Sequence, residues 1–176
     1  MNVFGIAGWS GSGKTTLMVA LLPLLVRSGL RVSTMKHTHE SVDLDRPGKD
    51  SYRHRAAGAC EVMLVSSSRW TLMHELRGDQ EPALDALLAR MTAVDLLLVE
   101  GFKAYPHPKL EVHRPALGRP LLCRQDPSIV AVASNGMPAG LAVPVLPLDD
   151  ADAIARFILA RCGLKSGHTT ERGHEP

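Results

Sequence analysis

The segment Gly8–Thr15, with the sequence GWSGSGKT, holds the residues of this chain best suited to bind phosphate. It matches the pattern G-x-x-x-x-G-K-[ST] in full, between an apolar run and a helical segment, as the pattern requires. Glycines let the backbone curl so that successive N–H groups point at one anion, and the N-terminus of the following helix adds a favourable dipole. We expect Lys14 to bridge the β- and γ-phosphates and the hydroxyl of Thr15 to bind Mg²⁺.

Glu100 is a second candidate, because it ends the apolar run of DLLLVEG, a continuous stretch of strand length. Ligands of open α/β sheets bind at the carboxyl ends of the strands, so this carboxylate should lie near the phosphate loop and orient Mg²⁺ or a water molecule. We therefore predict Lys14 and Glu100 as catalytic residues, with Glu100 and Thr15 as metal ligands. Such strands more commonly end in Asp, and a surface carboxylate at a strand end needs no ligand to explain it.

Lys36 and His37 follow a second expected strand, Leu30–Met35, so they should emerge at the same edge and contact the phosphates. The polar segment that follows is rich in charge, Pro and Gly, as in functional or mobile loops. Asp50 in this segment could hold a metal-bound water, which makes it a third candidate metal ligand. A solvated polar loop explains Asp50 almost equally well.

The elements that must position these residues alternate between strands and helices. Alternation of this kind predicts an α/β fold of the P-loop NTPase type, with three layers and a mostly parallel, doubly wound sheet. We expect strands at residues 3–7, 30–35, 61–66, 70–73, 95–99, 129–133 and 143–146, and helices at 16–27, 50–59, 81–91 and 151–162.

The segment Lys109–Cys123 is harder to interpret. Lys109–His113 alternates polar and apolar residues like an exposed strand, and two prolines interrupt the residues that follow. Since Pro is confined to edges and bulges of sheets, we predict an irregular β edge region here.

The composition limits the function classes. A chain of 176 residues fits one domain, expected over residues 1–164, and the polar residues 165–176 are expected to be a disordered tail. Twenty basic and eighteen acidic residues nearly cancel without long blocks, which argues against a nucleic-acid partner. No run approaches 18 apolar residues, so no membrane span is expected, and three scattered cysteines favour the reducing cytoplasm.

The motifs together resemble the MobB family, the GTP-binding accessory proteins of molybdopterin guanine dinucleotide synthesis. The resemblance covers nearly the whole chain except the last dozen residues, and its specific parts are the GKDS stretch and VEGFK. It rests on five elements in order: GWSGSGKTTL, TMKHTHE, DRPGKDSYRHRAAGA from Asp45 to Ala59, LLLVEGFK, and DPSIVAVAS from Asp126 to Ser134.

The resemblance implies a homodimeric GTP-binding protein, with weak hydrolysis at most, that assists the nucleotidyltransferase attaching GMP to molybdopterin. The molybdenum cofactor guanylyltransferase and molybdopterin-bearing proteins would then be its partners. Glu100, with Asp50, would serve Mg²⁺, and the edge region Lys109–Cys123 could join the sheets of two subunits. The residues that would hold the phosphates of GTP are Gly11, Ser12, Gly13, Lys14, Thr15 and Thr16.

Guanine selectivity is implied by the resemblance alone. The usual guanine-reading tetrad, Asn or Thr followed by Lys, any residue and Asp, is absent from the sequence. Asn135 follows a strand at a place suited to contact the base and is our candidate for it. The pair Asn135–Gly136 could equally be a simple turn.

An ATP-dependent small-molecule kinase or a dethiobiotin-synthetase-like ligase is the alternative, because such enzymes share the loop and a strand ending in Glu-Gly. They usually carry an arginine-bearing lid over the phosphates. The best lid candidates here, Arg114 and Arg119, lie in a Pro-broken segment without a helical pattern. A nucleotide-gated adaptor without useful turnover overlaps with the MobB interpretation. Trp9, inside the loop, would either stack on a ligand or pack over the loop.

Overall fold

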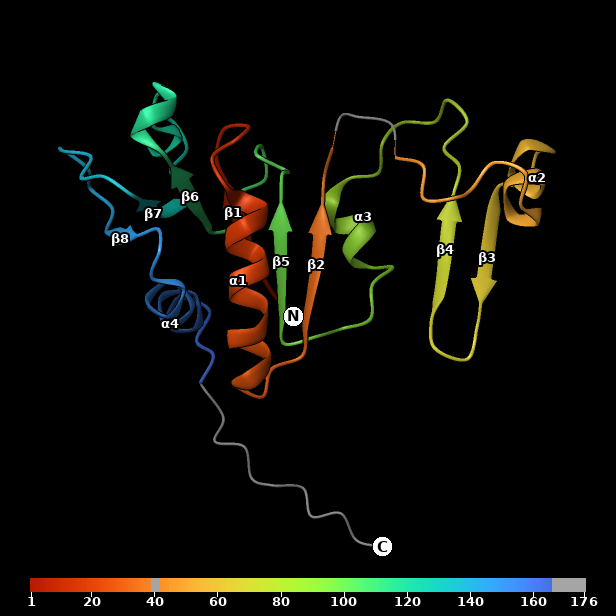
Figure 1. The fold of residues 1–176 in the computed structure, drawn as a ribbon, viewed down its shortest axis with the longest axis horizontal. Coiled ribbons are helices and arrows are strands. Elements are labelled where there is room, and N and C mark those ends of the chain that lie inside the picture. The colour runs from red at the N-terminus through yellow and green to blue at the C-terminus, as the bar shows by residue number, and fades with distance from the viewer. Residues whose placement is uncertain (39–41, 166–176) are drawn as a thin grey trace, which may run out of the picture. The chain divides into compact units, whose positions relative to one another are not determined.

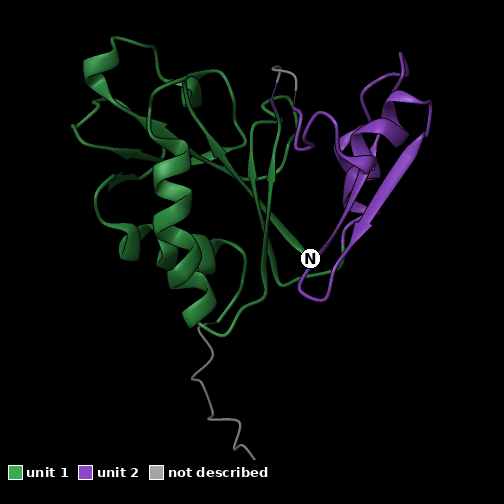
Figure 2. Ribbon diagram, turned by 45° about the vertical axis from the view of Figure 1, so that its right-hand side comes forward, with its two compact units in different colours: residues 1–37, 92–176 green, residues 38–91 purple. Residues whose placement is uncertain are grey.

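The structure is a computed structural model that describes residues 1–38 and 42–165. These residues form two compact units, one of residues 1–37 and 92 onward, and one of residues 38–91 (Figure 2). The domain expected over residues 1–164 therefore contains two units. The expected tail, residues 165–176, lies outside the described residues except for Lys165.

The first unit is built on a six-stranded sheet with the order β2-β5-β1-β6-β7-β8 (Figure 1). All neighbouring strands run parallel, which confirms the predicted parallel α/β fold. The carboxyl ends of the strands therefore meet at one edge. The strands are β1 (Asn2–Ala7), β2 (Val32–Lys36), β5 (Leu96–Glu100), β6 (Lys109–His113), β7 (Ile129–Ser134) and β8 (Val145–Pro147).

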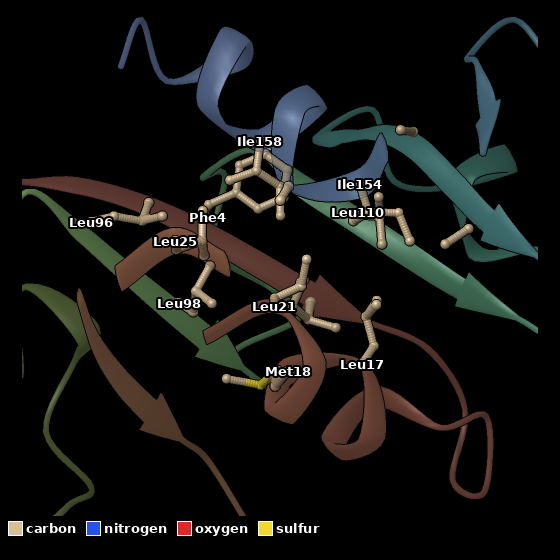
Figure 3. Packing of buried hydrophobic residues seen from close by; sticks show 14 of the residues in the cluster. Phe4, Leu17, Met18, Leu21, Leu25, Leu96, Leu98, Leu110, Ile154 and Ile158 are labelled. Atoms are coloured by element: carbon tan, nitrogen blue, oxygen red, sulfur yellow. The ribbon is translucent and has the colours of Figure 1, made fainter. Parts of the chain in front are cut away.

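Helices α1 (Lys14–Arg27) and α4 (Ala151–Arg161) contact each other and pack on the sheet. Leu17, Leu21, Leu24 and Leu25 recur at helical spacing along α1; three of them are buried, and Leu24 is half-buried against the core. Figure 3 shows the three buried side chains beside residues of β1, β5, β6 and α4. This apolar layer fixes the start of α1, and so the phosphate loop, against the end of β1.

Strand β6 corrects one prediction. Lys109–His113 is not at an edge of the sheet, because β6 pairs with β1 on one side and β7 on the other. Both of its hydrogen-bonding sides are used, so β6 cannot join the sheets of two subunits. The rest of the segment is irregular, as expected, with two short 3-10 helices at Pro115–Leu117 and Leu122–Arg124.

The polar residues of β6 are buried, which explains the misleading alternation. Glu111, fully buried, accepts hydrogen bonds from the backbone N–H groups of Leu122 and Cys123 at 2.8 and 2.9 Å. Lys109, 1% exposed, donates to the hydroxyl of Ser128 and lies 3.3 Å from a carboxylate oxygen of Asp126. The segment that follows β6, rather than water, provides the hydrogen-bond partners of these groups. Alternating polar residues look the same in the sequence whether water or protein groups satisfy them.

The second unit contains helix α2 (Asp50–Ala56), the antiparallel hairpin of β3 (Glu61–Val65) and β4 (Trp70–His74), and helix α3 (Leu84–Leu88). The helix predicted over residues 81–91 is shorter than expected. Pro82 disfavours helical backbone at Glu81, the residue before it, so the helix begins only after the proline. Arg55 ties the unit together through ion pairs with Asp43 and Glu75 at 2.9 and 3.0 Å. Within the described parts of the chain, no helix combines the length and apolar character that crossing a membrane would need.

Candidate nucleotide-binding site

The loop between β1 and α1 has a backbone that only glycine adopts readily. Gly8, Gly11 and Gly13 have φ angles of 144°, 77° and 98°. A Cβ atom on Gly8 would come within 2.6 Å of the carbonyl oxygen of Val112 on β6. Gly13 precedes α1 without a side-chain cap, so the first N–H groups of the helix remain available to an anion.

Lys14 lies over this loop, where its ammonium donates to the carbonyl oxygen of Trp9 at 3.0 Å. Burial lowers the pKa of Lys14, the Glu100 carboxylate opposes this shift, and the nearby cations Lys103 and Lys36 add to it. Cations from three segments thus gather at the loop. An anion placed among them would relieve their mutual repulsion, which is the electrostatic character a phosphate site requires.

The Thr15–Glu100 pair lies at the start of α1. The hydroxyl of Thr15 donates to a carboxylate oxygen of Glu100 at 3.2 Å, and Glu100 is only 8% exposed. These two oxygens fit Mg²⁺, which prefers oxygen ligands and keeps several waters, so that few protein ligands suffice. The structure thus brings together three predicted site residues, Lys14, Thr15 and Glu100.

The end of β2 meets the same edge of the sheet. Lys36 is opposite Glu100 in the strand register, and the N–H of His37 donates to the carbonyl oxygen of Glu100 at 2.8 Å. Gly101 allows this approach, because an added Cβ would lie 2.7 Å from the Cβ of His37. The His37 ring also lies 4.6 Å from the ring of Phe102, between centroids. Lys36 and His37 are therefore placed where the sequence predicts them.

Arg114 is a site residue that the sequence interpretation undervalued. Its Nε donates to the carbonyl oxygen of Ser12 at 2.9 Å, and a Cβ on Gly13 would lie 3.2 Å from its guanidinium. The guanidinium thus rests on the phosphate loop. The available signal was its position directly after β6, at the carboxyl end of a parallel strand.

Trp9 has partners within the protein. Its indole N–H donates to the carbonyl oxygen of Pro120 at 2.8 Å. The cationic groups of Lys103 and Arg119 each lie 5.5 Å from its ring centroid. Of the two roles considered for Trp9, these contacts favour packing over the loop.

Asp50, the third candidate metal ligand, belongs to the second unit. There it begins α2, with a side chain that is 88% exposed and that pairs with Arg53 at 3.7 Å. This pair explains the carboxylate without a metal, and a metal role for Asp50 stays a prediction.

A cavity of about 290 Å³ opens beside Asn135, at the carboxyl ends of β7 and β8. Ligand sites of open sheets lie at this edge, and the volume is at the small end for ligand pockets. Asp149 also lines it and was missed as a site residue, since the sequence indicates only a helix cap at this position. The cavity is lined by Ser134, Asn135, Gly136, Met137, Val145, Leu146, Pro147 and Asp149.

Comparison with known proteins gives consistent matches. The MobB family model, described as molybdopterin guanine dinucleotide synthesis protein B, matches residues 3–135, which include every site residue predicted from the sequence. The molybdopterin-guanine dinucleotide biosynthesis adapter protein of Escherichia coli (strain K12) is 41% identical over 89% of this chain and 91% of its own length. The adapter protein of the same name from Haemophilus influenzae is 40% identical over 89% of this chain and 86% of its own length. The crystal structure of a MobB protein homolog from Bacillus stearothermophilus has a TM-score of 0.69 and 28% identity, covering 93% of this chain and 99% of that one.

Proposed function

This chain belongs to the MobB family, and from that premise we propose that it is a GTP-binding adapter protein of molybdopterin guanine dinucleotide biosynthesis. The observation that carries the nucleotide part is the Thr15–Glu100 contact of 3.2 Å beside an open glycine loop. The loop and the uncapped start of α1 provide N–H donors for phosphate oxygens, and the contact provides two oxygens for a cation.

Each predicted residue of the first unit has a proposed part in this site. Gly11, Ser12, Gly13 and Thr16 hold phosphate oxygens through the backbone and hydroxyl groups at the start of α1. Lys14 bridges the terminal phosphates, and Thr15 and Glu100 hold the Mg²⁺, which screens the charge of the phosphates. Lys36 belongs to the group of cations at the loop, His37 follows it at the end of β2, and Asn135 lines the cavity where the base would lie.

We propose that GTP hydrolysis by the isolated protein is slow or depends on a partner. Glu100 is already engaged with Thr15, and the guanidinium of Arg114 is held on the carbonyl oxygen of Ser12. Glu100 is thus not free to take a proton from water, and the guanidinium of Arg114, which stays protonated, cannot act as a base. A turnover of about 1 s⁻¹ or more, the low end of ordinary enzymes, would contradict this proposal.

We propose that the protein is a homodimer joined through the β3–β4 hairpin. Met63 is opposite Leu72 and Val65 is opposite Trp70, so these four side chains share one face, with exposed fractions of 43–73%. Among the described residues β3 and β4 pair only with each other, and a two-stranded sheet is marginal alone, so it gains from packing against a second copy. Trp70→Glu should shift the mass measured by analytical ultracentrifugation from dimer to monomer, and an unchanged dimer would exclude this interface.

The guanylyltransferase of the pathway and molybdopterin-bearing proteins are the partners we propose, in keeping with the adapter name of the relatives. We also propose a cytoplasmic location. All three cysteines are free thiols, as expected in a reducing compartment.

The first experiment is a thermal-shift titration of the full chain with Mg²⁺ and GTP, ATP, dethiobiotin or uridine, with Lys14→Ala as the matched control. A ligand at a hundred times its Kd adds about 2.7 kcal/mol of stability. GTP should shift the wild type and leave Lys14→Ala unshifted. A response dominated by ATP with a small acceptor would instead indicate a kinase or ligase and overturn the proposed function.

A further inference from the structure

The cavity between the ends of β7 and β8 lies within reach of a nucleotide whose phosphates occupy the loop. Neighbouring strands lie about 4.8 Å apart, so β7 is about 10 Å and β8 about 14 Å from β1 across the sheet. A ribose and its glycosidic bond separate a base from its phosphates by a distance of this order. The cavity is thus placed where the base of such a nucleotide would lie.

A short chain of contacts links the loop to the cavity. Arg114 contacts the loop at Ser12, and the next residue, Pro115, packs against Gly136, where an added Cβ would come within 2.8 Å of the proline ring. Gly136 in turn lines the cavity. A nucleotide lying along this edge would therefore cross the end of β6, where Arg114 and Pro115 begin the irregular segment.

The cavity has walls suited to a flat heteroaromatic ring. Val145, Leu146 and Pro147 provide an apolar side, and Met137, 91% exposed, is an adaptable side chain at its rim. Asn135 and Asp149 provide polar groups. Small-molecule sites typically combine apolar walls with a few placed polar groups of this kind.

Asp149 is available to a ligand, whereas its neighbour is not. Asp150 caps α4 by accepting from the N–H of Ala153 at 2.8 Å. Asp149 is exposed, and its carboxylate makes no hydrogen bond or ion pair with the residues that the structure describes. Asp150 therefore caps α4 alone, which leaves Asp149 without a structural role in helix capping.

We propose that this cavity is the base subsite and that the carboxylate of Asp149 selects guanine, an inference that rests on the proposed nucleotide-binding function. A carboxylate only accepts hydrogen bonds, and guanine presents two adjacent donors, N1–H and the 2-amino group. Adenine presents an unprotonated N1 at that position, which a carboxylate repels. The amide of Asn135 can donate to the acceptors O6 or N7 of guanine. The guanine-reading group thus comes from the segment after β8 rather than from the usual tetrad.

The substitution Asp149→Asn tests this assignment, because xanthine carries a carbonyl oxygen where guanine carries the 2-amino group. The carboxamide of Asn donates to that oxygen, whereas Asp cannot. We expect Asp149→Asn to weaken binding of Mg²⁺-GTP about 10- to 100-fold and to tighten binding of Mg²⁺-XTP, with no loss of ATP affinity. Isothermal titration calorimetry of the full chain gives the three dissociation constants.

Asp152→Asn is the matched control, since Asp152 is an exposed aspartate in the first turn of the same helix. It removes the same charge near the helix N-terminus and should leave all three dissociation constants unchanged. The guanine-reading role would be refuted if Asp149→Asn left the ratio of the GTP and XTP dissociation constants unchanged. It would also be refuted if the substitution weakened binding of GTP, XTP and ATP equally. Equal binding of ATP and GTP by the wild type would refute guanine selection while leaving nucleotide binding intact. A wild type that binds no nucleoside triphosphate would overturn the proposed function and this inference with it.

Discussion

The buried carboxylate of Glu111 offers a sharp test of how the site region is held together. It is fully buried in β6 and accepts hydrogen bonds from two backbone N–H groups, those of Leu122 and Cys123. These bonds anchor the irregular segment that also carries Arg114. Glu111→Gln keeps the shape of the side chain but replaces one acceptor oxygen with an NH₂ donor. One of the two N–H groups would then face a donor and lose its partner.

The magnitude follows from that geometry. A hydrogen bond to a charged group contributes about 1.5–3 kcal/mol, and an unsatisfied polar group that is shielded from water costs about 1–3 kcal/mol. Removing a buried charge returns part of this cost, so we expect Glu111→Gln to lower the free energy of unfolding by about 2–4 kcal/mol. For a chain of this size, that corresponds to a decrease in Tm of roughly 5–15 °C.

Urea denaturation followed by circular dichroism measures this change, with the m-value as a check that the same surface is exposed on unfolding. Glu61→Gln is the control, because Glu61 on β3 is half exposed and pairs with His74 at the surface. Exposed ion pairs contribute at most about 1 kcal/mol, so this variant should be nearly as stable as the wild type. If Glu111→Gln is no less stable than Glu61→Gln, the anchoring role assigned to Glu111 is wrong.

Three further predictions concern other parts of the first unit. Burial lowers the pKa of His107, so the unfolded chain binds the proton more readily, and the free energy of unfolding should fall as the pH drops from about 7 to 5. His107→Gln should flatten the plot of unfolding free energy against pH between 7 and 5, whereas substitution of the exposed His54 by Gln should leave its slope unchanged. Equal slopes for the two variants would contradict the role given to His107. Gly101→Ala should cost about 2–4 kcal/mol in urea denaturation, because its φ is 99° and the new Cβ would lie within 2.7 Å of a side-chain carbon. Gly140→Ala, with φ of 68° and open space around it, should cost only about 1–2 kcal/mol, so equal costs would exclude the steric argument. Arg114→Ala should weaken Mg²⁺-GTP binding about tenfold or more in calorimetry, through loss of the hydrogen bond to the phosphate loop, and an unchanged Kd would exclude this role.

Local patterns in the sequence predict the parts of the protein whose physics is local. The phosphate loop needs glycines, a lysine and a hydroxyl at fixed spacing within a single short loop, so Gly8–Thr15 is recognisable without a structure. The apolar stripe of α1 and the run before Glu100 predict a buried helix face and a buried parallel strand for the same reason. The expected strand Leu30–Met35 likewise placed Lys36 and His37 at the edge of the sheet where the structure has them.

The tertiary structure decided what depends on distant partners. Lys109 and Glu111 alternate with apolar residues as on an exposed strand, yet groups up to 19 residues away satisfy them inside the protein. Arg114 contacts the phosphate loop because β6 pairs with β1, and these two strands are separated by more than 100 positions in the sequence. Asp149 lines a cavity only because β7 and β8 end side by side. A sequence pattern reports the period of burial along one segment, whereas the identity of the covering group is set by which strands become neighbours in the sheet.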